Sequence, residues 1–343
     1  MKGYGIIIGM TGGGFMGELA FQEGREYIFK DGGLERRIRS FIPSCFIICP
    51  LPVRSIKEGE KGYEKRINNF KLKLTGAYGI PGGKIARDLL MLFTTEAVYR
   101  KNYDEDKIKL NFKSIRDLQR SIGMKTIVES DKVLDMLKKY SGCIMNFEIE
   151  MKKEFDGQTL LFNKDDFKEL RGYGEKGSKV SYYSITNVPF ISKLEKLDLI
   201  RAESRRGESV LIELTLMSEF VDMVRKNAVP VDFTVYSDIQ GAMMQDLYVW
   251  LVYKNYKNWK EEEIFIPKDK FIEQFGTEGE KNENMKYSRI LESLEKIRKE
   301  YYENLRYKVI DDGKRREKGI LFYRSPVLTK EKDIKYVPLL TRM

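Results

Sequence analysis

The order of helix-like and strand-like segments after residue 88 occurs a second time from residue 246, and this repeat limits the folds open to the chain. The first copy is predicted from apolar spacing to contain a helix at 88–101, a strand at 107–111, helices at 114–123 and 129–140, and a strand at 143–151. The second copy contains a helix at 246–257, a strand at 263–267, helices at 267–276 and 284–301, and strands at 305–310 and 319–326. An offset of about 153 to 158 residues indicates a tandem duplication.

Helix, strand, helix, helix and a two-stranded wing is the order of the winged helix-turn-helix. We therefore predict an α+β fold of two tandem winged-helix domains, the first with an elaborated wing. The strand at 143–151 needs a return partner, for which 208–216 is the best candidate, so residues 151–209 are predicted to be an inserted wing. The predicted organisation is a Gly-rich N-terminal segment at 1–50, a first domain at 51–217, a linker helix at 218–240, a second domain at 241–330 and a tail at 331–343.

The charge balance favours an anionic partner. The 62 Lys and Arg residues exceed the 52 Asp and Glu residues by 10, and the sequence pI is about 9.1. Nucleic acid is the commonest partner of such a basic protein, and a merely soluble basic protein is the alternative.

The chain contains no histidine, which excludes Ser-His-Asp triads, Cys-His dyads, HExxH zinc sites and nucleases that hold a metal with imidazoles. Cys45, Cys49 and Cys143 are too few for a disulfide scaffold, which favours a reducing compartment. The run FIPSCFIICPL is predicted to be a buried strand. No run of 18 apolar residues occurs, so we predict a cytoplasmic protein with no membrane partner.

Two glycine-rich stretches resemble nucleotide-binding loops. GIPGGKIARDLL contains Lys84 but has Ile85 where a phosphate loop needs a hydroxyl, so we interpret it as a turn and helix start with Lys84 and Arg87 exposed. GMTGGGFMGEL matches GxGxxG, but only about six helical residues follow before Gly24, which favours a flexible or hairpin-like N-terminus. No cofactor is predicted.

Acidic residues that could hold two metal ions all lie in charged turns, where a solvated loop is the ordinary explanation. They are Asp104, Glu105, Asp106, Asp165, Asp166, Asp311 and Asp312. We predict a protein that is not an enzyme and has no catalytic or metal site, with an NTPase or a metal-dependent nuclease as the alternative class.

The long helix at 284–301 has one apolar and one polar side. Its predicted inward stripe is Ile290, Leu291, Leu294, Ile297 and Tyr301. Its outer side would read DNA in the major groove, with Arg289 as the best candidate for a bidentate guanine contact; a solvated basic face is the alternative. The predicted DNA-binding residues are Asn282, Asn284, Lys286, Ser288, Arg289, Ser293 and Lys296 around this helix, Lys314, Arg315, Arg316 and Lys318 in the wing, and Lys132, Lys138, Lys139, Arg205 and Arg206 in the first domain.

Two stretches carry a resemblance to a known family. Residues 51–101, with YEKRINNFKLKL, GIPGGKIARDLL and TTEAV, resemble the start of the plasmid-encoded RepA replication initiator family. PVDFTVYSDIQGAMMQDLYVWLVY at 230–253 is similar to a later segment of that family. The resemblance spans about residues 45–260, and the Gly-rich N-terminus and the insertion at 151–209 have no counterpart in it.

The resemblance implies two winged-helix domains that bind repeated double-stranded sites at a plasmid replication origin and help to open it. It further implies host replication proteins as partners and a homodimer formed through the first domain. A winged-helix transcriptional repressor would use the same contacts and is the alternative within the same class.

Overall fold

The computed structural model describes residues 37–60, 62–68, 70–100, 108–112, 114–124, 130–152, 180–199, 209–257, 263–276, 280–311, 318–325 and 334–335, in a mixed α+β architecture. The helices are α3 (Ser44–Ile48), α4 (Gly83–Tyr99), α5 (Ile115–Ser121), α6 (Ser130–Ser141), α7 (Ser218–Asn227), α8 (Phe233–Asp238), α9 (Ala242–Lys257), α10 (Lys268–Phe275) and α11 (Glu283–Glu300). The strands are β1 (Arg37–Pro43), β2 (Tyr63–Ile67), β3 (Phe70–Gly76), β4 (Lys109–Phe112), β5 (Cys143–Lys152), β6 (Val180–Pro189), β7 (Ile191–Leu199), β8 (Ser209–Leu216), β9 (Ala228–Asp232), β10 (Glu263–Pro267), β11 (Tyr307–Ile310), β12 (Gly319–Tyr323) and β13 (Ile334–Lys335).

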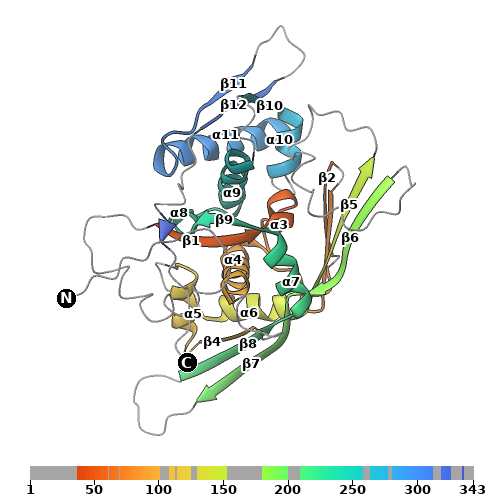
Figure 1. Cartoon of the computed structure of the whole chain (residues 1–343), viewed down its shortest axis with the longest axis vertical. Helices are drawn as coiled ribbons and strands as arrows, with labels where there is room; N and C mark the ends of the chain where they lie inside the picture. Colours follow the sequence, from red (N-terminus) through yellow and green to blue (C-terminus); the bar gives the residue numbers. More distant parts are fainter. Residues whose placement is uncertain are drawn as a thin grey trace, which may run out of the picture.

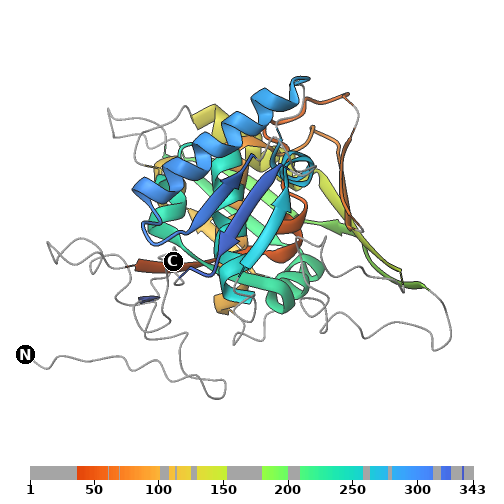
Figure 2. The ribbon, with the colours of Figure 1, turned by 90° about the horizontal axis from the view of Figure 1, so that it is seen from above.

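The later part of the chain, which we call the second module, consists of α9, β10, α10, α11, β11 and β12. Its three strands form an antiparallel sheet in the order β10-β12-β11. Trp250 of α9 is buried and meets the rings of Phe271, Phe275 and Phe322 edge-on, with centroids 5.6 to 5.7 Å apart. One aromatic cluster therefore joins the first helix to α10 and to the sheet, and α11 lies across them (Figure 2).

The first module consists of α4, β4, α5, α6, β7 and β8, and its sheet has the corresponding order β4-β8-β7. The helices α5 and α6 begin at residues 115 and 130, and their counterparts α10 and α11 begin at 268 and 283, so both pairs are offset by 153 residues. The two modules therefore share the order helix, strand, helix, helix and two final strands, with β5 and β6 inserted before the final strands of the first module.

The pairing of the strand after α6 differs from the prediction. The predicted partner of 143–151 was 208–216, but β5 lies between β3 and β6, with Leu72 opposite Phe147. The strand β8 instead lies between β4 and β7, with Leu110 opposite Leu214. Each of these two strands pairs on one side with a strand that is its neighbour in the sequence: β5 pairs with β6, and β8 pairs with β7. The inserted element is thus the β5–β6 hairpin, which extends the β2–β3 sheet on one side of the molecule (Figure 1).

The segment FIPSCFIICPL is not a single buried strand. The strand β1 ends at Pro43, and the next five residues form the short helix α3, in which Cys45, Phe46, Ile47 and Ile48 are buried. A short run that is apolar on every side can be a buried strand or a buried helix, and periodicity does not separate the two. Cys45, Cys49 and Cys143 are all buried free thiols.

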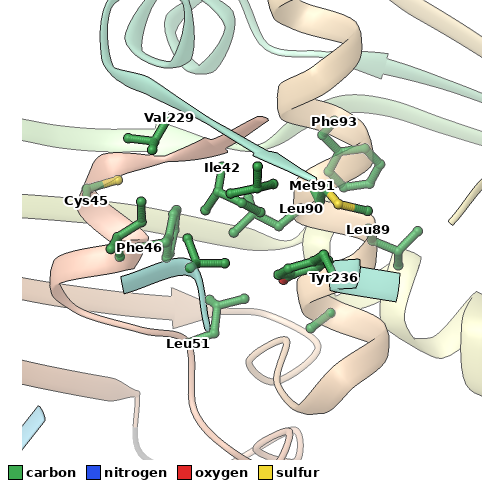
Figure 3. Packing of buried hydrophobic residues seen from close by; sticks show 14 of the residues in the cluster. Ile42, Cys45, Phe46, Leu51, Leu89, Leu90, Met91, Phe93, Val229 and Tyr236 are labelled. Atoms are coloured by element: carbon green, nitrogen blue, oxygen red, sulfur yellow. The ribbon is translucent and has the colours of Figure 1, made fainter. Parts of the chain in front are cut away.

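The strands β1 and β9 form a ribbon in the centre of the molecule, between α4 and α9 (Figure 1). The sequence analysis placed residues 37–50 and 228–232 outside the two domains, as part of an N-terminal segment and a linker. Figure 3 shows Ile42 of β1 and Val229 of β9 close to Leu90 of α4, with Phe46 of α3 beside them. Both segments therefore contribute to the hydrophobic core that the two modules share. Among the helices of the described residues, none is long and apolar enough to span a membrane.

Candidate nucleic-acid interface

The helix α11 is positioned by a cap at its start and an apolar stripe along its inner side. Asn282 is the N-cap, and its Oδ1 accepts hydrogen bonds from the backbone N–H groups of Asn284 (3.0 Å) and Met285 (3.2 Å). The predicted stripe is confirmed, because Ile290, Leu294 and Ile297 are fully buried, and the partly buried Leu291 and Tyr301 pack against the same core.

The rest of α11 carries six of the predicted DNA-binding residues. Asn284, Ser288, Arg289 and Lys296 are exposed, whereas Lys286 and Ser293 are half-buried. The hydroxyl of Ser293 donates to the carbonyl of Arg289 at 2.9 Å, one turn back in the helix. Asn284, Ser288 and Arg289 thus present polar groups to solvent on the first half of the helix, where a helix in a major groove contacts base edges.

Arg289 lies next to an acidic neighbour on the surface. Its Nη1 is 3.4 Å from Oε2 of Glu280, and about half of its side chain, 49%, is exposed. The other oxygen of Glu280 accepts the backbone N–H of Asn282, which holds the carboxylate at the start of α11. Surface ion pairs of this kind contribute about 0 to 1 kcal/mol, so the guanidinium can exchange Glu280 for another anion. Lys296 forms a similar exposed pair with Glu300 at 3.8 Å.

The base of the wing lies close to the start of α10. Lys318, just before β12, is exposed, and its Nζ is 2.6 Å from Oδ1 of Asp311 across the wing. The backbone N–H of Lys268, the first residue of α10, donates to the carbonyl of Lys318 at 2.8 Å. The predicted tip residues Lys314, Arg315 and Arg316 lie outside the described residues.

In the first module, two of the predicted lysines are exposed and one is not. Lys132 and Lys138 lie on the outer side of α6, and Nζ of Lys138 is 4.5 Å from the ring centroid of Tyr78. Lys139 is only 7% exposed, because its Nζ is bonded to Asp135 at 2.7 Å and to Ser55 at 3.3 Å. Lys139 therefore does not lie on the exposed face of α6 with Lys132 and Lys138, as its predicted contact with DNA would require. Arg205 and Arg206 lie outside the described residues.

The glycine-rich segment before α4 is occupied by the chain itself. A turn and helix start were predicted here, and the helix begins at Gly83, five residues before the predicted segment 88–101; the backbone N–H of Gly83 donates to the carbonyl of Pro52 at 3.0 Å. A Cβ on Gly82 would come within 2.7 Å of the backbone of Arg54 and Ser55. Nζ of Lys84 is bonded to Oδ2 of Asp88 at 2.9 Å and to the carbonyl of Ser237 at 3.1 Å. The lysine is therefore engaged inside the protein and not directed at an open loop. The GxGxxG stretch lies outside the described residues.

The prediction that Arg87 is exposed is wrong. Its side chain is 2% exposed, and Nε and Nη2 contact the two carboxylate oxygens of Asp246 in α9, each at 2.7 Å. Its Nη1 donates to the carbonyls of Pro52 and Gly83, each at 3.0 Å. Burial raises the pKa of Asp246, and the neighbouring guanidinium opposes that rise. The two segments that carry the family resemblance therefore meet through Arg87 and Asp246.

A second polar contact lies beside this pair. Nε2 of Gln245 donates to Oδ1 of Asp88 at 2.7 Å, and Asp88 is fully buried. Burial raises the pKa of Asp88 to about 6, against the opposing effect of Lys84. The side chains of Lys84, Arg87, Asp88, Gln245 and Asp246 thus form one polar cluster that joins α4 and α9, the first helices of the two modules.

Sequence reasoning missed Lys268, whose Nζ is 2.6 Å from Oδ1 of the predicted DNA-binding residue Asn284. The sequence feature that could have pointed to it is a lysine at the first position of α10, the short helix that precedes α11 in the repeat. The acidic residues considered as metal ligands lie outside the described residues except Asp311, which is exposed. Within the described ranges, no group of three or more Cys, Asp or Glu side chains could hold a metal ion.

Comparisons with known proteins find similar structures but no similar sequence. No family model matches the chain, and no curated protein does. A crystal structure of domains 2 and 3 of RctB is 12% identical, with a TM-score of 0.46, and the match covers 82% of this chain and 97% of that one. A second crystal structure of the same domains is 11% identical with a TM-score of 0.43, and the match covers 80% of this chain and 94% of the other. We base no assignment of family or function on a likeness of this size, and the comparisons do not show membership of the RepA family.

Proposed function

We propose that the chain is a sequence-specific double-stranded DNA-binding protein built from two winged-helix domains. The observation that supports the proposal is the repeated topology: α5, α6 and the sheet β4-β8-β7 correspond to α10, α11 and the sheet β10-β12-β11, as expected of two winged helices. In the second module, the third helix α11 presents Asn284, Ser288 and Arg289 to solvent beside the base of the wing. This arrangement suits a helix in the major groove and a wing along the backbone.

The net charge of +10 supports the same partner, because neutralising phosphates releases counterions and favours binding. Selection of bound duplexes from a random pool tests the proposal directly. A winged-helix reader is expected to enrich one sequence, whereas a merely basic protein would enrich none.

The more specific role that we propose is initiation of plasmid replication, by binding origin repeats and promoting their opening. It is supported by the residues at 51–101 and 230–253 that resemble the RepA initiators. A plasmid that carries the selected sequence is expected to depend on this protein for replication. A protein that binds the sequence and silences a promoter, without supporting replication, would instead be the transcriptional repressor.

We further propose that the protein is not an enzyme and that it acts with host replication proteins, as a homodimer formed through the first module. Hydrolysis of ATP, or cleavage of DNA in magnesium or manganese, would contradict the first part. A monomer at all concentrations, with and without the selected DNA, would contradict the dimer.

Replacing Arg289 with Ala is expected to weaken binding to the selected site by about 1 to 3 kcal/mol and binding to random DNA only slightly, because a bidentate contact to guanine distinguishes between bases. Titrations of both duplexes measure the two effects. Lys299→Ala is the matched control, since Lys299 lies at the other end of α11 with 70% of its side chain exposed. Equal losses on both duplexes would show that Arg289 contacts only phosphate.

Replacing Arg315 and Arg316 together with Ala is expected to weaken binding to every duplex. The slope of log affinity against log salt should fall by roughly two units, about one for each phosphate contact that is lost. Affinities measured over a series of salt concentrations give this slope. An unchanged slope would exclude the two arginines from the DNA interface.

A further inference from the structure

Lys268 lies where the second helix of the second module, the wing and α11 meet. Its backbone is fixed by the bond to the carbonyl of Lys318, and its side chain is half-buried. The ammonium is 5.4 Å from the ring centroid of Tyr287 and 2.6 Å from Oδ1 of Asn284. It is therefore held between an aromatic ring and an amide, both from the first turns of α11.

This contact fixes which way the amide of Asn284 points. A lysine ammonium has three donors and no acceptor, so the amide atom 2.6 Å away must be the oxygen. The oxygen and the nitrogen of an asparagine amide are ordinarily told apart by their hydrogen-bond partners, and here the ammonium identifies the oxygen. The Nδ2 group has no hydrogen-bond partner among the described residues, and its two N–H donors are left for a ligand.

We propose that Lys268 determines the base specificity of Asn284 and directs it toward guanine instead of adenine. The inference rests on the proposed DNA-binding function and deepens it. An asparagine reads adenine with its oxygen accepting from N6 and its nitrogen donating to N7. Because the ammonium of Lys268 already donates to Oδ1, the N6 amino group of adenine, which is itself a donor, would meet donors where it needs an acceptor. Guanine presents two acceptors, O6 and N7, which match the donors of Nδ2 and Lys268.

The test compares base preferences and not overall affinity, because a structural role for Lys268 would weaken all sites alike. The full chain is used to select duplexes from a random pool, and the position read by Asn284 is the one whose selectivity Asn284→Ala abolishes. At that position, wild-type protein should bind guanine about tenfold more tightly than adenine. Lys268→Met, which frees Oδ1, should reduce this ratio to one or below. Lys268→Arg, which keeps a donor, should preserve it.

The outcomes separate this inference from the proposed function. A wild-type pool without any enriched sequence would overturn both. An enriched sequence would leave the function standing, and three results would then overturn the role of Lys268 alone: a preference for adenine at the Asn284 position, an unchanged ratio in Lys268→Met, or no position that responds to Asn284→Ala. Thermal unfolding of each variant tests whether the substitutions leave the fold intact.

Discussion

Replacing Arg87 with Ala is expected to lower the free energy of unfolding by about 3 kcal/mol, because it leaves the largely buried carboxylate of Asp246, of which 15% is exposed, without its partner. Asp246 would lose both contacts of the guanidinium, and the carbonyl of Pro52 would lose a donor. Domains of ordinary stability unfold with about 5 to 15 kcal/mol, so the loss would be a large part of the total. Urea unfolding followed by circular dichroism measures it.

The control for this prediction is Arg66→Ala, since Arg66 is an exposed arginine of β2 and its loss should change stability by less than about 0.5 kcal/mol. The pair Arg87→Met and Asp246→Leu is informative, because replacing both buried ions with apolar side chains removes the uncompensated charge. The double variant should be more stable than Arg87→Ala. If the double variant is less stable than Arg87→Ala, and the stability losses of the two single variants add up to its own loss, Arg87 and Asp246 are not energetically coupled.

The repeat could be predicted from the sequence because it depends on local signals. Helices such as α11 have an asparagine cap and apolar residues at helical spacing, and Ser114 at the start of α5 accepts the backbone N–H of Asp117. Such signals lie within a few residues of the element that they define. The partners of β5 and β8 could not be predicted in this way, because an alternating strand shows which side is buried but not which strand lies beside it.

The exposure of single side chains was predicted less well, for a related reason. The helix α4 is enclosed on every side, and all twelve residues from Ala86 to Ala97 are buried. Lys84 and Arg87 were predicted to be exposed because they are charged, although Arg87 contacts Asp246 of α9. The helix α11 has one buried face only, so Ser288, Arg289 and Lys296 are exposed as predicted, although Lys286 and Ser293 are half-buried. The contact of Lys268 with Asn284 joins residues 16 positions apart and depends on how α10 packs on α11.

A second prediction concerns Glu96, a carboxyl group inside α4 that is 2% exposed. Its Oε2 is 2.9 Å from Nε of Arg100, whereas its Oε1 has no hydrogen-bond partner within the part of the chain that the structure describes. Burial raises the pKa of Glu96 to about 7 from an ordinary value of 4.5, and Arg100 only partly opposes this rise. The folded protein therefore binds this proton more tightly than the unfolded chain does.

A raised pKa in the folded state means that the contribution of Glu96 to stability is fully present below pH 4.5 and is lost as the pH rises through about 7. Glu96→Gln keeps an acceptor for Arg100 and removes this ionisation. The stability of the variant relative to wild type should accordingly increase by about 2 to 3 kcal/mol between pH 5 and pH 8. Urea unfolding of both proteins at the two pH values measures the difference, and Glu64→Gln, at an exposed position of β2, should show no comparable change. A difference that stayed constant between the two pH values would mean that Glu96 is ionised throughout, with Arg100 fully compensating its burial.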